Sequence, residues 1–128
     1  MKGDNSFGKT ERLSSAKAID KLFKNGARFN NYPVKVYWKL RGNQDVGEIK
    51  ILISVPKKNF AKAVERNLIK RRIREVYRKN KHILFSELAK KNQASIEIAF
   101  IYIGQNIIEY NELENKVISA LQSLVQFL

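Results

Sequence analysis

The stretch that decides the fold is residues 57–81, with the sequence KKNFAKAVERNLIKRRIREVYRKNK. It holds eleven lysines and arginines but only two acids, Glu65 and Glu75, in a chain of 128 residues whose formal net charge is +13. Like charges packed this closely repel one another, and a polyanion bound to their exposed side relieves that repulsion. The placement of these charges around a helix therefore bears on both the fold and the partner.

On a helix, where each residue advances about 100°, the stretch divides into two separate stripes. With Ala61 at zero, the apolar stripe spans about 60° to 160° and the basic arc about 180° to 280°. The apolar stripe consists of Ile69, Ile73, Val76 and Tyr77. The basic arc consists of Asn67, Lys70, Arg71, Arg74, Arg78 and Lys81. The pattern predicts a helix, running to about Asn80, that packs on a sheet and presents its cations to nucleic acid.

Length and composition predict a globular protein of a reducing compartment. A chain of this length buries about two-thirds of its unfolded surface, and 44% apolar residues argue against disorder. It has no cysteine, which excludes a disulfide framework. The first residues lack the apolar run of a signal peptide, and no stretch approaches the roughly 20 apolar residues of a membrane span. We expect a cytoplasmic protein that does not bind a membrane, with a flexible basic arm at 1–11 and a single RNA-binding domain at 12–128.

The segments before the basic stretch predict one helix and two long strands. Ser14 or Ser15 is a suitable cap for the helix SSAKAIDKLFKNG, which we expect Gly26 to end in a left-handed conformation. A short extended segment at 27–30 precedes a clear strand at 33–41. A second strand at 48–55 follows a turn, so the two long strands are predicted to pair as an antiparallel hairpin.

The segments after the basic stretch predict one more strand and one more helix. We expect no regular structure over 82–92, and then an apolar, central strand at 95–103. A final amphipathic helix starts at Tyr110 or Asn111; its apolar stripe is Leu113, Val117, Leu121, Leu124 and Val125. The order α-β-β-β-α-β-α predicts an α+β fold, a two-layer α/β sandwich around one core.

The strand at 33–41 alternates in a way that suggests a second binding surface. Val34, Val36, Trp38 and Leu40 point to one face. Lys35, Tyr37 and Lys39 point to the other, where an aromatic ring between cations suits single-stranded nucleic acid. A solvated outer face with an incidental tyrosine is the alternative, and the strand alone leaves it open.

Catalytic chemistry is sparse in this sequence. His82 is the one histidine, there is no cysteine, and the twelve acids are scattered without the spacing of a two-metal nuclease site. There is also no glycine-rich phosphate-binding loop. A self-sufficient enzyme is therefore not expected, and no catalytic residue and no metal site is assigned.

At the basic stretch the sequence resembles a known family. The pattern Ser54-Val-Pro-Lys-Lys, followed by Ala63-Val-x-Arg-Asn-x-x-Lys-Arg-x-Ile-Arg-Glu75, is similar to the signature of the bacterial ribonuclease P protein subunit. Arg12-Leu13, the helix ending in Leu22-Phe23-x-x-Gly26, and Val36-Tyr37 also fall in the family's order. The resemblance covers most of the chain.

This resemblance implies an accessory subunit of a ribonucleoprotein enzyme. A catalytic RNA, using Mg²⁺, cleaves precursor tRNA to generate the mature 5′ end, and the protein binds that RNA and the 5′ leader of the substrate. No cofactor is assigned to the protein itself and no protein partner is required. The resemblance also implies a left-handed βαβ crossover, as in domain 2 of ribosomal protein S5, although the general rule for such crossovers is right-handed.

The family's functional positions carry over to two groups of residues. The group implied to contact the catalytic RNA is Arg66, Asn67, Lys70, Arg71, Arg74, Arg78, Lys57 and Lys58. The group implied to contact the precursor-tRNA leader is Phe23, Tyr37, Lys35, Lys39 and Ile19. The chain departs from the family at Leu68, where arginine is common, at Ile19, where an aromatic is frequent, and at Pro56, where serine is usual.

Two other functions remain as alternatives. A ribosomal or other structured-RNA binding protein uses the same basic helix and sheet but has no role in tRNA cleavage. A basic helix bound to a membrane or DNA needs to be an independent element, whereas this helix lies between two strong strands and contributes its apolar stripe to the core.

Overall fold

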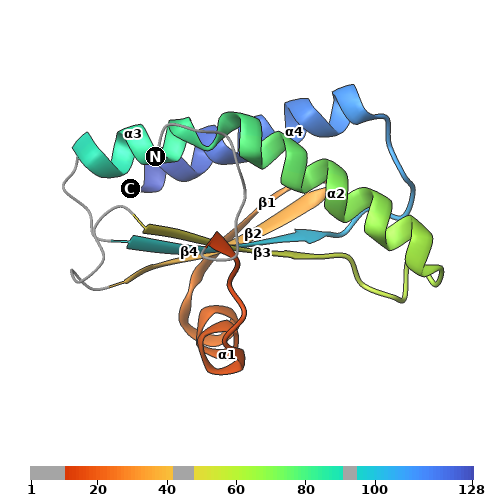
Figure 1. The fold of residues 1–128 in the computed structure, drawn as a ribbon, viewed down its shortest axis with the longest axis horizontal. Helices are drawn as coiled ribbons and strands as arrows, with labels where there is room; N and C mark the ends of the chain where they lie inside the picture. Colours follow the sequence, from red (N-terminus) through yellow and green to blue (C-terminus); the bar gives the residue numbers. More distant parts are fainter. Residues whose placement is uncertain (1–10, 42–47, 91–94) are drawn as a thin grey trace.

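The structure is a computed structural model that describes residues 11–41, 48–90 and 95–128. Its elements follow in the order α1 (Ala16–Asn25), β1 (Ala27–Asn31), β2 (Val34–Arg41), β3 (Glu48–Ser54), α2 (Ala63–Asn80), α3 (His82–Lys90), β4 (Ser95–Tyr102) and α4 (Tyr110–Phe127). Helices α2, α3 and α4 lie on one face of the sheet and α1 lies on the other (Figure 1). The predicted α+β class is confirmed.

Strand β4 lies between β2 and β3, in a sheet of order β1-β2-β4-β3. It runs antiparallel to β2, with Val34 opposite Tyr102, and parallel to β3, with Glu48 opposite Ser95. The predicted hairpin of β2 and β3 is therefore wrong, because β4 separates these two strands. The physical reason is the composition of β4, which is buried on both faces and so is most stable with a ladder on either side.

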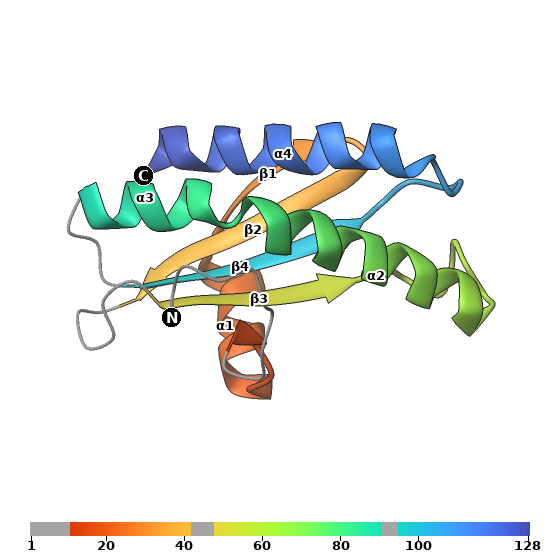
Figure 2. The same ribbon diagram turned by 45° about the horizontal axis from the view of Figure 1, so that its top comes forward.

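The connection from β3 to β4 passes through α2 and α3, and it is left-handed. In Figure 2 these helices lie in front of the sheet, β3 and β4 both point to the right, and β4 lies above β3. With the strands turned to point upward, the chain moves to the left as it crosses in front, which defines a left-handed crossover. The handedness implied by the family resemblance is confirmed against the general right-handed rule.

Residues 82–90 form helix α3, although we expected 82–92 to lack regular structure. The amides of Leu84 and Phe85 donate to the Lys81 carbonyl at 3.0 and 3.1 Å, so α3 follows α2 almost without a break. Leu84 and Leu88, one turn apart, are buried, and Phe85 packs against the same core. A helix of nine residues repeats its apolar positions too few times for the pattern to reveal it.

The main core lies between the sheet and the three helices on its face. The apolar stripe of α2 is buried as predicted, with Ile69, Ile73, Val76 and Tyr77 each at most 1% exposed. From α4, Leu113, Val117, Leu121 and Leu124 are buried and Val125 packs against them. Burial raises the pKa of the Tyr77 phenol, so this hydroxyl stays neutral at physiological pH.

Helix α1 crosses the opposite face of the sheet. The Leu13 amide donates to the Ile51 carbonyl of β3 at 2.9 Å, so the chain enters α1 from the β3 edge. From there the helix runs across the strands (Figure 2). Beneath it, Leu13, Leu22 and Ala99 form a separate buried cluster.

The structure confirms the predicted start of α1 but not the predicted conformation at its end. Ser15 caps the helix, since its hydroxyl accepts a hydrogen bond from the Ala18 amide at 3.2 Å. The left-handed conformation expected at Gly26 is wrong, because Gly26 is extended, with φ −77° and ψ 160°. Glycine is needed there for space: a Cβ would lie 2.6 Å from the Leu22 carbonyl oxygen and 2.9 Å from that of Trp38.

A largely buried ion pair ties the start of the described chain to the junction of α2 and α3. Lys81 is only 5% exposed, and its Nζ lies 2.8 Å from Oε2 of Glu11. Placing Lys81 on the exposed basic arc was therefore wrong, since the helix turns this side chain toward the amino-terminal segment. Residues 1–10 of the predicted arm lie outside the described residues.

We expect that removing one partner of this ion pair destabilises the fold more than removing both. We expect Lys81→Met to lower the free energy of unfolding by about 3–5 kcal/mol, because the Glu11 carboxylate then stays largely buried without its cation. Adding Glu11→Leu should recover part of that loss, since the double variant leaves no charge unpaired. Lys79→Met is the matched control, because Lys79 is half exposed and its Nζ makes only long contacts, at 3.8 Å from Glu75 and 5.9 Å from the centre of the Tyr110 ring. Urea unfolding measures all four proteins, and a Lys81→Met protein as stable as the parent would contradict the prediction.

Candidate nucleic-acid interface

Helix α2 presents a row of polar and cationic side chains beside its buried stripe. We call Asn67, Lys70, Arg71, Arg74 and Arg78 the basic face. Asn67 and Arg71 are exposed, while the other three are half-buried. The division of α2 into an apolar and a basic side agrees with the prediction, apart from Lys81. Leu68, at the position where the family commonly has arginine, is half-buried.

One cation of the basic face has a partner on the same helix. Arg78 Nη2 lies 2.7 Å from Oε2 of Glu75, and its Nε donates to Oε1 at 3.1 Å. These hydrogen bonds lower the pKa of Glu75 and raise that of Arg78. A pair that stays this open to the solvent contributes little stability. Its effect is to hold Arg78 in one position, which leaves Lys70 and Arg71 as the more adaptable charges.

Arg66 has a structural role that the sequence did not reveal. Its guanidinium donates to the carbonyls of Phe60 and Ala61, at 2.8 and 2.9 Å, and so closes the loop that leads into α2. Arg72, on the far flank of the buried stripe, donates in the same way to the Ile108 carbonyl at 3.0 Å and ties α2 to the segment before α4. Both residues are arginines whose hydrogen bonds go to backbone, which charge patterning cannot distinguish from phosphate contacts.

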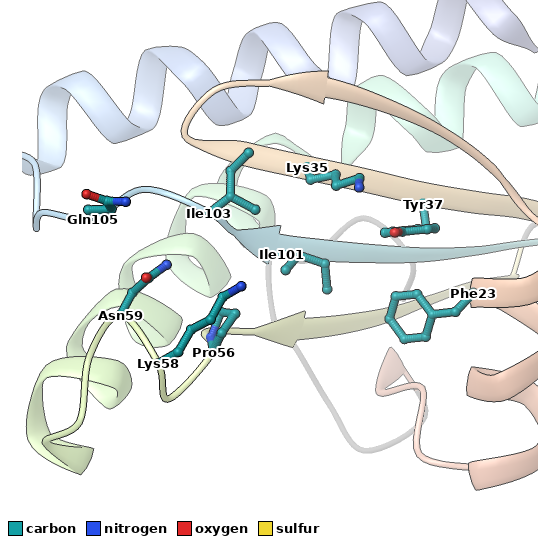
Figure 3. A pocket seen from close by; sticks show the side chains of 9 residues that line it. All are labelled: Phe23, Lys35, Tyr37, Pro56, Lys58, Asn59, Ile101, Ile103 and Gln105. Atoms are coloured by element: carbon teal, nitrogen blue, oxygen red, sulfur yellow. The ribbon is translucent and has the colours of Figure 1, made fainter.

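The opposite face of the sheet carries an open groove of about 500 Å³ beside α1 (Figure 3). We call it the aromatic groove. It is lined by Phe23, Lys35, Tyr37, Pro56, Lys58, Asn59, Ile101, Ile103 and Gln105. These residues come from α1, from β2, from β4 and the segment after it, and from the loop between β3 and α2.

Two aromatic rings and a lysine meet in this groove. The rings of Phe23 and Tyr37 pack edge to face, with centroids 4.7 Å apart and planes at 80°. Lys35 Nζ lies 5.4 Å from the centre of the Tyr37 ring, within range of a cation–π contact. Figure 3 shows Tyr37 and Phe23 close together at one end of the groove. Both side chains are half-buried, so each packs against the other and keeps part of its ring open to the solvent.

The groove separates residues that the sequence had grouped together. Lys58 was grouped with the contacts to the catalytic RNA, but it lines the aromatic groove opposite Phe23, while Lys57 is exposed just before it. Ile101 and Ile103 were missed, although their alternation with Tyr102 places them on this face. Gln105 follows β4, and no pattern in the sequence marks it.

Two of the five residues assigned to the leader do not line the aromatic groove. Ile19 is half-buried and packs against the cluster beneath α1, which Phe23 and Tyr37 of the groove also contact. Lys39 lines a second groove of about 470 Å³, which we call the lysine groove. This groove is lined by Ser15, Lys17, Ala18, Lys21, Lys39, Leu40, Arg41 and Glu97. Helix α1 lies between the two grooves, which occupy different parts of the same strands. Along β2, Lys35 and Tyr37 of the aromatic groove precede Lys39 of the lysine groove; along β4, which runs the other way, Ile101 of the aromatic groove follows Glu97.

Two structural features are absent from the described residues. Across 11–41, 48–90 and 95–128, no three histidine or acidic side chains gather into a set that could hold a metal ion. His82 is exposed at the start of α3. In the same part of the chain, no helix has the length and apolar character needed to cross a membrane.

Comparison with known proteins identifies one family. A family model described as Ribonuclease P matches residues 7–124. The ribonuclease P protein component of Porphyromonas gingivalis strain W83 is 35% identical over 118 residues, which cover 91% of this chain and 85% of that protein. The component of Petrotoga mobilis is 29% identical over 126 residues, covering 93% and 95% of the two chains.

Solved structures give the same result for the fold. The RNase P protein of Thermotoga maritima superimposes with a TM-score of 0.69 at 23% identity, covering 88% of this chain and 96% of that one. The RNase P protein of Staphylococcus aureus gives a TM-score of 0.66 at 23% identity, covering 91% and 96%. At this level of identity the likeness shows that the fold is shared.

Proposed function

This chain belongs to the ribonuclease P protein family, and we propose that it is the protein subunit of ribonuclease P, which removes the 5′ leader from precursor tRNA. In this role it binds a catalytic RNA through the basic face of α2 and the leader through the aromatic groove. The catalytic step is assigned to the RNA, which acts with Mg²⁺. The protein improves affinity for the substrate and the use of the metal.

The observation that carries this proposal is the arrangement of Phe23, Tyr37 and Lys35 in an open groove. A base that stacks on an aromatic ring gains about 1–3 kcal/mol whatever its identity, and a lysine beside the ring neutralises the phosphate that follows. An unpaired strand presents both groups at once, whereas a duplex hides its bases. The groove therefore suits a single-stranded leader whose sequence varies from one precursor to the next.

The basic face lies on a different element and suits a folded RNA. It offers side chains at three- and four-residue spacing along one side of a helix, so several phosphates of a rigid backbone can be contacted together. It contains no aromatic ring, so its contacts are with phosphate and sugar. Because α2 and the aromatic groove lie on opposite faces of the sheet, one protein can hold the catalytic RNA and the leader at the same time (Figure 1).

Reconstitution tests the proposed function directly. The purified protein alone should show no nuclease activity, and adding it to the catalytic RNA at low Mg²⁺ should stimulate 5′ maturation of precursor tRNA. The holoenzyme should also bind precursor tRNA more tightly than mature tRNA, since only the precursor carries a leader. A folded protein that gives no stimulation would refute the proposal. Stimulation with equal affinity for both tRNAs would indicate a structured-RNA binding protein that does not contact the leader.

The basic face is tested by the salt dependence of binding. We expect the double variant Lys70→Ala/Arg71→Ala to bind the catalytic RNA more weakly and to flatten the plot of log affinity against log salt, by roughly 1 for each phosphate that is no longer neutralised. The matched control is Lys90→Ala/Lys116→Ala, which removes the same charge from exposed positions on α3 and α4. Equal slopes for the two double variants would show that general charge, rather than this face, determines binding.

Tyr37 is tested by comparing precursor with mature tRNA. Tyr37→Ala should weaken holoenzyme binding of precursor tRNA by roughly 1–3 kcal/mol if a base stacks on the ring, and should leave mature tRNA almost unaffected. Tyr37→Phe is the control, because it keeps the ring and its packing against Phe23 but removes the hydroxyl. If Tyr37→Ala weakens both tRNAs equally, its role is to pack against Phe23 rather than to bind the leader.

A further inference from the structure

The lysine groove has no role in the function proposed so far, and its charges call for an explanation. Lys17, Lys21 and Lys39 line it, and no ion pair within the described part of the chain involves any of these three. Lys17 and Lys21 are also one turn apart on α1, a spacing at which like charges destabilise a helix. A bound anion would offset this repulsion.

The acid in this groove does not neutralise the lysines. Glu97 is only 7% exposed, and its carboxylate lies 3.4 Å from Nε of Arg41, which also donates to Glu48 at 3.3 Å. Arg41 is therefore held between two carboxylates. The three lysines remain as the charges of the groove that can move to meet a ligand.

The lining of the groove indicates which part of a nucleic acid it can bind. It contains no aromatic side chain, so it offers no surface on which a base can stack. Lysine is a flexible point charge that binds phosphate without demanding a fixed geometry. The groove therefore suits the sugar–phosphate backbone of a strand and is indifferent to its sequence.

The position of the groove connects it with the aromatic groove. Lys35 and Lys39 lie on the same face of β2 and are four residues apart, a separation of roughly 13 Å along the strand. Helix α1 lies between the two grooves, and Lys17 and Lys21 are on its exposed surface. A strand that leaves the aromatic groove and crosses α1 thus meets these two lysines before it reaches Lys39.

We propose that the lysine groove binds the phosphate backbone of the upstream part of the 5′ leader, beyond the nucleotides held in the aromatic groove. This inference rests on the proposed function, since it takes the leader to occupy the aromatic groove first. Short leaders end before the lysine groove and long leaders reach it. The chain then holds long leaders at two separate places.

The test varies leader length and groove charge together in the reconstituted holoenzyme. Leaders of about 2 and about 15 stacked nucleotides reach roughly 7 and 50 Å, so only the longer one covers the roughly 13 Å between Lys35 and Lys39. We expect Lys17→Ala/Lys21→Ala to weaken binding of the long-leader precursor by roughly tenfold at low salt, because two phosphates are then no longer neutralised. Binding of the short-leader precursor and of the catalytic RNA should not change. The matched control is again Lys90→Ala/Lys116→Ala, and thermal unfolding checks that all variants are folded.

Each other outcome has a distinct meaning. Equal affinities of the variant and the control for the long-leader precursor would overturn the lysine groove as a leader site. An equal loss for short and long leaders, or weaker binding of the catalytic RNA, would overturn it too, because the lysines would then contact another part of the complex. A parent holoenzyme that does not distinguish precursor from mature tRNA at either leader length would instead refute the proposed function itself.

Discussion

The position of β4 between β2 and β3 is the constraint on which the rest of the structure depends. Because β4 runs parallel to β3, the chain must cross from one end of the sheet to the other, and α2 and α3 make that crossing on a single face. These helices bury their apolar stripes there together with α4. Of the described helices, only α1 crosses the opposite face (Figure 2). A groove lies on each side of it.

This arrangement lets a chain with a net charge of +13 remain folded. The cations are not spread evenly: one set lines the outer side of α2, a second set lies around the two grooves, and others are held by specific partners. Lys81 is paired with Glu11, Arg41 with Glu48 and Glu97, and Arg78 with Glu75. Separation over two faces limits the self-repulsion within each set. In the proposed function, this separation would let two RNA segments bind without competing for the same residues.

The local sequence pattern correctly predicted which side of a helix or strand faces the core. The apolar stripe of α2 and the alternation of β2 follow from periods of 3.6 and 2 residues, which depend only on neighbours along the chain. Pairing between strands is different, because two strands adjacent in sequence can be separated by a third that arrives much later in the chain. The predicted hairpin was wrong for that reason, and α3 was missed because its apolar repeat is short. The roles of Arg66 and Lys81 were equally hidden, since their partners are backbone carbonyls or a carboxylate brought close only by folding.

The sequence by itself determined the elements, the charge, the two candidate surfaces and, through its resemblance to a family, the kind of partner. Tertiary structure alone decided which cations remain available and how the sheet face is divided. Tyr37 and Lys39 are neighbours in the alternation of β2, yet α1 places them in different grooves. Side-chain periodicity states which face a residue points to, but not what packs over that face. Only the packing of α1 across the strands turned one predicted surface into two.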